Sequence, residues 1–490
     1  MTCDEKKEST SATTSAKPKR MIVVGGGLAG LSAAAALMKA GLVQMGHEVI
    51  VLEARRRVGG RAASFEDPLT GGLVDACQHV AMGCCTNFLD LCKQAGVAGS
   101  LRRDRTLYFI GHDGIPAACT PSVWLPAPLH LGPLLLGMRH FTFREKTALA
   151  LGLLRLARYN RKKRGTHVQK DSGIQDETAQ TWLEFIGQPE RVIRLFWQPV
   201  LESALGESID LVSVVAARKV VVDGFLAHRN ASDLYVPTQP LGRLFGEHLV
   251  EWLKNCGVTV ETGRSVTAIQ LDATGRVSAV RCGTEEILCD SLIVALPWKQ
   301  AARLLPDIVP VGNEHLTGSP ITAVHLWFDR DVMNLPHAVL VGRVSQWVFR
   351  GDDSQKNVPG YCQVVISASR GLQGDDRDVL LATVISELKA IFPAAREAQL
   401  LNARIVTDPT AVLSVRPGVE AVRPAAVTHV PNLFLAGDWT ATGWPSTMEG
   451  AVRSGRLAAQ AAGGSLIVSQ QWQTPDLPKN WLVRSIIGTR

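Results

Sequence analysis

The sequence predicts an α/β fold in which a dinucleotide-binding domain is joined to a domain of mixed sheet and helices. Three observations support this prediction. An apolar run at 21–24 leads into the glycine-rich stretch 25–30, an acidic residue, Glu53, ends the next apolar run, and a late apolar run at 433–436 ends in Gly-Asp. A strand, a glycine turn and a helix in this order can hold a pyrophosphate at the helix N-terminus. We therefore expect segments near both ends of the chain to build one cofactor site.

The size and composition of the chain fit a globular protein with two domains. Its 490 residues can form two substantial cores, and 46% hydrophobic with 20% charged residues is an ordinary balance. The net charge of +7 is mild and the basic residues are scattered, so nucleic acid is not an expected partner. No run approaches roughly 18 apolar residues, which argues against a spanning helix. The ten cysteines form no zinc-type pairs, so we expect a reduced, cytoplasmic compartment and no metal.

Domain boundaries follow from local composition and pattern. Residues 1–20 are rich in Ser, Thr, Lys and Glu and lack the apolar core of a signal peptide, so we expect a disordered tail. We predict a discontinuous cofactor-binding domain at 21–80, 236–300 and 425–465, a substrate domain at 81–235 and 301–424, and a C-terminal tail at 466–490.

Hydrophobic periodicity predicts the elements in chain order. Small residues at helical spacing predict a helix at 28–40 that packs closely on a sheet, and residues 80–235 are mostly helical in pattern. A second clear helix is predicted at 447–462. Apolar runs predict strands at 21–24, 47–52, 257–261, 266–271, 277–282, 292–296, 321–328, 361–369 and 433–436.

The glycine-rich turn carries the strongest binding prediction. Gly25 permits a tight turn, Gly27 lets backbone approach a pyrophosphate, and Gly30 lets helix and strand touch. At the end of the second strand, Glu53 can bond the hydroxyls of an adenosine ribose. Residues 42–46 look like an insertion between this helix and strand, and we expect them to bulge outward.

The segment that follows extends this site. Guanidinium groups at Arg55 and Arg61 can reach the ribose and the phosphates, and Gly60 precedes Arg61 in a second glycine pair. The alternative is that these are ordinary surface arginines, which fits Arg56 and Arg57 better than Arg61, because Arg61 follows the glycine pair. Val266, at the start of a predicted strand, is a further candidate for a cofactor contact.

The second half of the predicted site follows the run at 433–436. Asp438 can bond the ribityl hydroxyls of a flavin, and Gly437 lets the cofactor pass close to the backbone. The joint occurrence of this segment with the glycine turn is far more specific than either alone. It predicts FAD as the cofactor.

A helix start lies just beyond this segment. Ser446 and Glu449 predict a capping box in which Ser446 caps the helix and Glu449 reaches back. Thr447 and Met448 would then lie at the positive end of the helix, beside the flavin. This end would favour the anionic reduced flavin.

With these motifs, the chain resembles the flavin amine oxidase and phytoene desaturase superfamily. More closely, it is similar to the squalene-associated FAD-dependent desaturases, understood as hydroxysqualene dehydroxylases. The resemblance implies a Rossmann-like FAD-binding domain of the glutathione-reductase type and an amine-oxidase-like substrate domain. The matching stretches are 25–30, 53–61, 75–80, 196–199, 231–237, 324–330 and 432–455.

Two departures from the superfamily pattern bear on activity. The family usually has Asn-Gly where this chain has Ala76 and Cys77, and Cys77 is expected to narrow the space beside the flavin. Amine oxidases carry a lysine on the strand that corresponds to 322–328, where this chain has His325. The missing lysine argues against amine oxidation.

The resemblance implies reductive removal of the hydroxyl of hydroxysqualene, giving squalene for hopanoid or sterol synthesis. Reduced FAD would deliver hydride to the carbon, and a proton donor should assist the departing hydroxyl. His79 is the first candidate for this acid, with Gln78 orienting the hydroxyl, and Asp233 is the second. The alternatives are structural: His79 bonds backbone, and Asp233 caps a turn.

A long polyene alcohol needs a deep apolar tunnel. Residues 120–157 supply many apolar side chains, and Trp197, Trp327 and Trp347 are candidate tunnel residues, although such residues are more often core. Three other functions stay open: an oxidative polyene desaturase, an amine oxidase, and a non-catalytic carrier of prenyl lipids. The intact stretch 437–450 argues against the carrier.

A basic run at 158–164 follows the apolar region. A solvated loop is the common outcome for such a run, and contact with anionic lipid is the alternative. Together with residues 481–487, it suggests a peripheral contact on the inner face of the cell membrane. An unknown electron donor for FAD and synthases of the squalene pathway are the other expected partners.

Overall fold

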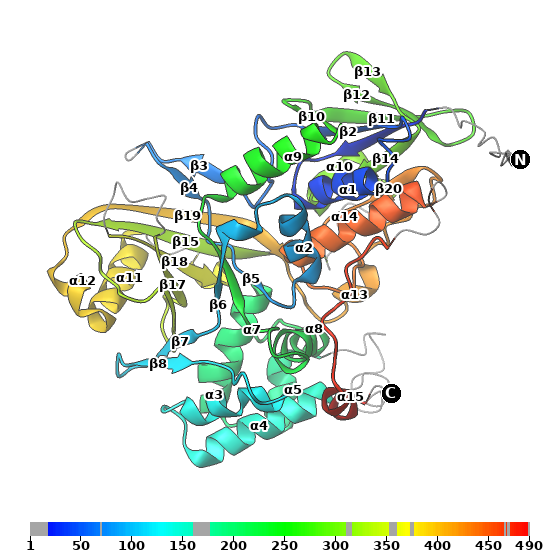
Figure 1. The fold of residues 1–490 in the computed structure, drawn as a ribbon. Helices are drawn as coiled ribbons and strands as arrows, with labels where there is room; N and C mark the ends of the chain where they lie inside the picture. Colours follow the sequence, from blue (N-terminus) through cyan, green and yellow to red (C-terminus); the bar gives the residue numbers. More distant parts are fainter. Residues whose placement is uncertain are drawn as a thin grey trace, which may run out of the picture.

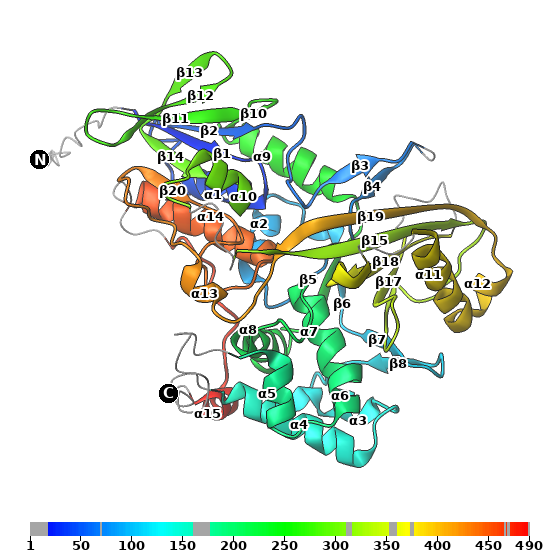
Figure 2. The ribbon, with the colours of Figure 1, turned by 180° about the vertical axis from the view of Figure 1, so that it is seen from behind.

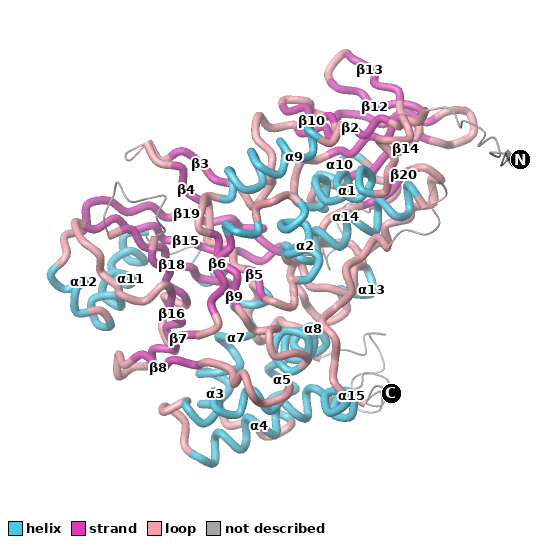
Figure 3. The backbone as a smooth tube through the Cα atoms, in the orientation of Figure 1, coloured by secondary structure: helices cyan, strands magenta, loops and turns pink. Residues whose placement is uncertain are grey.

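The computed structural model describes residues 18–68, 71–159, 177–309, 316–351, 360–372, 377–464, 467 and 471–488. A five-stranded sheet with its helices lies at one end of the molecule, a seven-stranded sheet lies in the middle, and a lobe of helices lies at the other end (Figures 1 and 2). The predicted α/β class is confirmed, and Figure 3 shows helices lying beside the strands of the first sheet.

The five-stranded sheet is fully parallel and has the order β10-β2-β1-β14-β20. Strands β2 and β10 lie on one side of β1, and β14 and β20 lie on the other. The strand order therefore reverses at β1, and ligands of such sheets bind at this point. All five predicted strands are present within about two residues. Their bounds are β1 Arg20–Val24, β2 Glu48–Glu53, β10 Thr259–Thr262, β14 Ser291–Val294 and β20 Leu433–Leu435.

Both faces of this sheet are buried. Alternate residues of β1 enter two separate cores, with Met21 and Val23 in one and Ile22 and Val24 in the other. The first core lies under α1 (Leu28–Lys39), α2 (Thr86–Gln94), α9 (Leu249–Asn255) and α14 (Met448–Gly463). The second lies under α10 (Trp298–Leu304) and the sheet of β11 (Val266–Leu271), β12 (Val277–Cys282) and β13 (Glu285–Leu288).

Helix α1 packs closely on α14, as its small residues predict. A Cβ at Gly455 would overlap the backbone of Ala29, and the Ser32 hydroxyl donates to the carbonyl of Val452 at 3.0 Å. The predicted outward bulge after α1 is correct only in part. Met45 is exposed, whereas Leu42 is buried in the core because the chain turns back there.

The seven-stranded sheet has the order β19-β15-β18-β17-β16-β7-β8. One face of β15 packs Val324, Leu326 and Phe328 against α11 (Arg377–Ile391) and α12 (Pro393–Glu397). The other face is turned toward the cofactor-binding part. The strands are β7 Leu107–Ile110, β8 Pro116–Cys119, β15 Gly318–Phe328, β16 His337–Leu340, β17 Trp347–Arg350, β18 Tyr361–Ser367 and β19 Leu400–Leu413.

The prediction that residues 80–235 are mostly helical is wrong for their first part. Besides β7 and β8, this stretch contains β5 (Ala81–Met82), β6 (Leu101–Asp104) and β9 (Leu234–Pro237), which form a small sheet. Strands this short carry too few alternating positions to be recognised. The helices of the lobe are α3 Gly132–Gly137, α4 Phe143–Ala157, α5 Ala179–Phe185, α6 Glu190–Val192, α7 Gln198–Leu205 and α8 Val214–Lys219.

The C-terminal segment runs along the molecule from the first part to the lobe (Figure 1). Trp472 is buried against α14, and α15 (Trp481–Ile487) packs against α4. Two short elements near the cofactor side are the hairpin of β3 (Ser64–Glu66) and β4 (Leu73–Asp75) and helix α13 (Val419–Val422). In the part of the chain that the structure describes, every helix is too short or too polar to cross a bilayer.

Candidate cofactor site and the adjoining sheet face

The glycine turn between β1 and α1 has the shape that its sequence predicts. Gly25 has φ +109°, and a Cβ there would lie 2.6 Å from the carbonyl oxygen of Ala295. A Cβ at Gly30 would overlap the carbonyl oxygen of Gly25. Both positions therefore require glycine because of the protein itself.

Gly27 differs from its neighbours in the turn. The nearest atom to a Cβ at Gly27 would be the Cα of Gly60, at 3.9 Å, so the protein leaves space on this side. Gly27 is also the N-cap of α1, and no side chain caps this helix end. An uncapped helix start beside open space suits the phosphates of a dinucleotide.

A second glycine pair borders this space. The N–H of Gly59 donates to the carbonyl of Gly26 at 2.8 Å, which places Gly60 next to Gly27. Glu53, at the end of β2, accepts from the N–H of Gly26 at 2.7 Å and from that of Arg55 at 2.8 Å. The Glu53 carboxylate is thereby fixed at the end of β2, where its sequence position predicts a ribose contact.

The side chains of the remaining candidates on this side are less constrained. Arg55 is exposed and contributes its backbone N–H to Glu53. Val266 starts β11 two residues after Arg264, whose N–H donates to the carbonyl of Glu53 at 2.8 Å. Both residues thus lie on segments that meet at the end of β2.

Arg61 joins this half of the site to the C-terminal half. Its guanidinium forms an ion pair with Asp438 at 2.5 Å and donates to the carbonyl of Ala411 at 2.9 Å. Burial opposes the charge, but the attraction and hydrogen bond of Asp438 outweigh it and raise the Arg61 pKa. The pair brings together two predicted cofactor residues that are 377 positions apart.

Gly437 and Asp438 follow β20 directly. Gly437 has φ +143°, a Cβ there would overlap the indole of Trp439, and its N–H donates to the Ser454 hydroxyl at 2.8 Å. Asp438 is buried and also accepts from the hydroxyl of Ser446. The segment is therefore held rigidly at the end of the parallel sheet beside β1.

The capping box predicted at the start of α14 is wrong. Thr447, not Ser446, is the N-cap, and its hydroxyl accepts from the N–H of Gly450 at 3.2 Å, so Met448 is the first helical residue. The Ser446 hydroxyl instead donates a hydrogen bond to the Asp438 carboxylate. Glu449 does not reach back, because buried amide groups at the start of α2 compete for its carboxylate.

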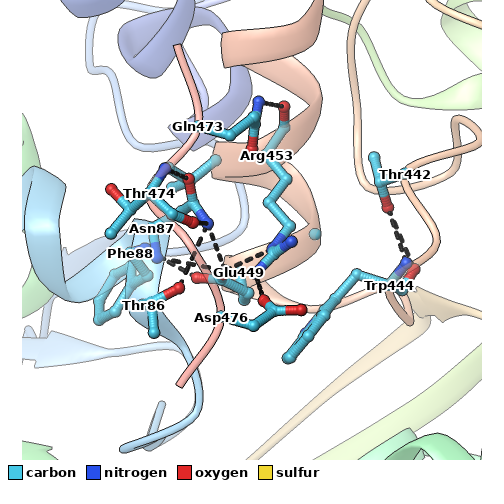
Figure 4. A network of polar contacts seen from close by, with 12 residues as sticks. Thr86, Asn87, Phe88, Thr442, Trp444, Glu449, Arg453, Gln473, Thr474 and Asp476 are labelled. Carbon is cyan, nitrogen blue, oxygen red and sulfur yellow. Dashed lines mark hydrogen bonds and ion pairs between the residues drawn. The ribbon is translucent and has the colours of Figure 1, made fainter. Parts of the chain in front are cut away.

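The contacts of Glu449 tie α14 to α2 (Figure 4). The buried carboxylate accepts from the N–H of Phe88 at 2.8 Å and from the Asn87 side chain at 3.0 Å, and it pairs with Arg453 at 2.6 Å. Arg453 in turn pairs with Asp476 of the C-terminal segment. This network fixes the helix start that follows the Gly437 segment.

The face of the seven-stranded sheet opposite α11 is aromatic and polar. His325 and Trp327 of β15 lie on it, and the rings of these two residues stack at 6.0 Å. Tyr361 and Gln363 of β18 pair with them across the strands, and the Tyr361 hydroxyl contacts His325 Nδ1 at 2.8 Å. These side chains are almost fully buried.

This face meets the loop that carries the catalytic candidates. The backbone N–H of Gln78 donates to the side-chain oxygen of Gln363. The Gln78 side chain lines a small polar cavity together with Asp75, Tyr361 and Gln363. The structure therefore places Gln78 against β18 of the seven-stranded sheet.

The His79 imidazole contacts the carbonyl of Cys77 at 2.8 Å through Nδ1. A carbonyl only accepts, so Nδ1 carries the hydrogen and Nε2 is the basic nitrogen of the neutral ring. Burial lowers the His79 pKa, and burial raises the pKa of the Cys77 thiol to about 12. Both groups are therefore neutral near pH 7.

Asp233 has the contacts of a structural residue. It is buried and forms an ion pair with Arg103, whose Nε lies 2.7 Å from Oδ2, and its carbonyl accepts from the N–H of Gly83 at 2.8 Å. These bonds fix the loop before β9.

The three candidate tryptophans have different surroundings. Trp197 is fully buried in the helical lobe and donates to Gln188 at 2.9 Å, as expected of a core residue. Trp347 pairs with Val365 in β18, which places it on the same sheet face as Trp327. It stacks on Phe349 at 5.5 Å, and its indole donates to Ser203 at 2.7 Å.

Sequence reasoning missed Tyr361, Gln363 and Phe349 as members of this face. The available signal was the presence of polar and aromatic side chains at alternate positions of apolar strands. In β18, Tyr361 and Gln363 are two positions apart and so share one face. The predicted basic contact at 160–164 lies outside the described residues.

Comparisons with known proteins agree with this geometry. A model of the flavin containing amine oxidoreductases matches residues 28–462. The chain is 28% identical over 460 residues to the 15-cis-phytoene desaturase of Solanum lycopersicum, covering 89% of this chain and 76% of the relative. It is also 28% identical over 456 residues to the hydroxysqualene dehydroxylase of Rhodopseudomonas palustris, covering 88% and 95%.

A solved structure shows the same fold. The cyclohexylamine oxidase of Brevibacterium oxydans has a TM-score of 0.67 at 17% identity, covering 92% of this chain and 99% of its own. The predicted superfamily and the predicted FAD cofactor are confirmed. The residues that would hold FAD are those of the glycine turn, Glu53, and the Arg61–Asp438 pair. The chain belongs to the flavin containing amine oxidoreductase family and is an FAD-dependent oxidoreductase.

Proposed function

We propose that this protein transfers hydride from reduced FAD to hydroxysqualene and releases squalene. The observation that carries the proposal is the buried aromatic and neutral polar face of the seven-stranded sheet, which meets the cofactor-binding part at Gln78. An apolar polyene with one hydroxyl needs such a lining, with many aromatic surfaces and few oriented polar groups.

The aromatic side chains of this face suit a reaction in which positive charge develops on carbon. Trp327, Trp347 and Phe349 lie on one side of the sheet, and the faces of aromatic rings attract cations. A departing allylic hydroxyl leaves such a charge behind. The face therefore supports chemistry at an isoprenoid carbon.

Position 325 supports an apolar alcohol over an amine. The superfamily resemblance places the lysine of amine oxidases on this strand, and this chain has His325 there. Burial lowers the His325 pKa to about 4, so the ring is neutral and serves as a hydrogen-bonding partner of Tyr361. We take the presence of His325 in place of lysine as support for a substrate without an amine.

The atoms and electrons of the reaction balance simply. Bound FAD supplies one hydride from its reduced form, and the C–O bond breaks while a proton converts the hydroxyl into water. Within this proposal, Gln78 orients the hydroxyl and His79 remains the first candidate for the proton donor. Because the His79 ring is neutral near pH 7, it must first bind a proton at Nε2. A partner reductase must then return two electrons to the flavin.

A second candidate function is oxidative desaturation of a polyene. It is favoured by the relatives named phytoene desaturase, which match this chain at the same level of identity as the dehydroxylase. The two reactions use the same lining and differ in the direction of hydride transfer. Residues that bind FAD do not separate them.

One anaerobic experiment distinguishes these functions. Photoreduced holoenzyme is mixed with hydroxysqualene, and flavin reoxidation is followed together with squalene. We expect one molecule of squalene to form for each flavin that is reoxidised. Oxidised holoenzyme that is instead bleached by phytoene or squalene would establish the desaturase. A protein that exchanges no electrons with any of these polyenes would overturn both proposals, and peroxide release with amines would point to an amine oxidase. A chain that binds polyene but no flavin would point to a carrier.

A further inference from the structure

Large apolar side chains are exposed on the helical lobe. Trp124 is 89% exposed, and its neighbours Val123 and Leu125 are exposed with it. Phe143 at the start of α4 is 79% exposed, and Trp481 at the start of α15 is 77% exposed. Side chains of this size are normally removed from water, so their grouping requires an explanation.

Hydrogen bonds place these residues in one region. The Asn480 side chain donates to the carbonyl of Ala127 at 2.8 Å, which sets Trp481 beside the loop that carries Trp124. Lys146 of α4 donates to the carbonyl of Leu136 in α3 at 2.6 Å. In Figures 1 and 2 these helices form the end of the molecule farthest from the five-stranded sheet.

Helix α4 carries large apolar residues on its exposed face. Phe143 and Leu151 are eight residues apart and both exposed, so they lie on one face of the helix, with Thr147 between them. Leu149 and Leu156 are buried on the opposite face. The helix therefore exposes two large apolar side chains in addition to those that it packs against the lobe.

The chain in and around α4 is predominantly basic. Between positions 139 and 158 the only acidic residue is Glu145, and the basic residues of the same stretch outnumber it; they are Arg139, Arg144, Lys146, Arg155 and Arg158. Basic side chains next to exposed aromatic residues match the headgroup region of an anionic bilayer. A protein partner would more commonly meet a flat, continuous apolar face, whereas here the large side chains lie on loop and helix ends.

We propose that the loop 123–129, the exposed face of α4 and the start of α15 form a docking surface for an anionic lipid bilayer. Trp124 and Phe143 enter the interface, and the basic residues contact lipid phosphates. This deepens the proposed function, on which it rests in one respect: the substrate of that function dissolves in the bilayer. Binding itself is measured without turnover.

The test uses flavin-loaded protein and sedimentation with vesicles. Vesicles of phosphatidylcholine are compared with vesicles that also contain phosphatidylglycerol. We expect binding to the anionic vesicles, weakened by salt, and at least about a tenfold loss of affinity in the double variant Trp124→Ser with Phe143→Ser. The matched control is Leu288→Ser, which removes another exposed large apolar residue, 62% exposed, on the other part of the molecule. It should bind like the unaltered protein.

Several outcomes would overturn the proposal. The unaltered protein could fail to bind anionic vesicles, or the double variant could bind them equally well. A dimer in solution that dissociates in the double variant would show that a second copy covers this surface. Retained flavin and unchanged turnover of detergent-solubilised substrate show that the variant is folded. Loss of vesicle binding alone is then distinct from failure of the proposed reaction.

Discussion

Replacing Gly27 with alanine tests whether the open side of the turn is reserved for FAD. The new Cβ would meet no protein atom within 3.9 Å, and the backbone φ of −76° suits alanine. Alanine is a poorer N-cap than glycine by about 0.5–1 kcal/mol. It also lowers the entropy of the unfolded chain, which stabilises the folded form by about 0.4–1 kcal/mol. The free energy of unfolding of the apoprotein should therefore change by less than about 1 kcal/mol.

The same substitution should weaken FAD binding strongly. The Cβ occupies the side from which the phosphates approach the backbone, so at least one hydrogen bond to a charged group is lost. Such a bond contributes about 1.5–3 kcal/mol, which corresponds to a rise in the dissociation constant of roughly 10- to 150-fold.

Two measurements on the apoprotein check this prediction. Quenching of flavin fluorescence gives the dissociation constant, and urea denaturation gives the free energy of unfolding. The matched control is Gly30→Ala, whose Cβ overlaps the carbonyl of Gly25, so it should destabilise the apoprotein itself. If Gly27→Ala binds FAD as tightly as the unaltered protein, the assignment of this space to the phosphates is refuted.

Three further predictions concern individual charged or titratable side chains. Glu449→Ala leaves buried partners unpaired and should cost about 3–5 kcal/mol in urea denaturation, whereas Glu48→Ala removes an exposed ion pair and should cost at most about 1 kcal/mol. If protonated His79 is the proton donor, turnover is lost as pH rises through its lowered pKa, so the rate should increase below pH 6.5 and His79→Gln should abolish that limb; a flat profile in the unaltered enzyme contradicts the role. Lys479→Met breaks the 2.9 Å pair with Asp223, and limited proteolysis should then release the C-terminal segment faster; equal rates would show that the pair does not hold the segment.

The sequence suffices for the cofactor-binding part because its signals are local. The glycine turn, the acidic end of β2 and the buried strands each depend on neighbours in the chain. The sequence predicts the start of α14 less well, because the N-cap is one residue later than expected. Ser446 and Thr447 can both cap a helix, and the hydrogen bond of Ser446 to Asp438 leaves the cap to Thr447.

The sheet face could not be assigned from the sequence for a different reason. Alternation in β15 separates His325 and Trp327 from Val324 and Leu326, but it does not say which set faces the cofactor. That choice depends on the bond between Gln78 and Gln363, which joins segments 285 positions apart.

The two long-range links have a common consequence for function. Arg61 with Asp438 joins the glycine-turn side to the end of β20, and Gln78 with Gln363 joins the loop after β4 to the aromatic face. Each link joins a segment near residue 70 to a later strand or turn. In the proposed function, the stretch between β2 and β5 therefore affects both FAD binding and the position of the substrate lining. Substitutions in this stretch should therefore alter cofactor affinity and substrate selectivity together, whereas substitutions elsewhere on the aromatic face should alter selectivity alone.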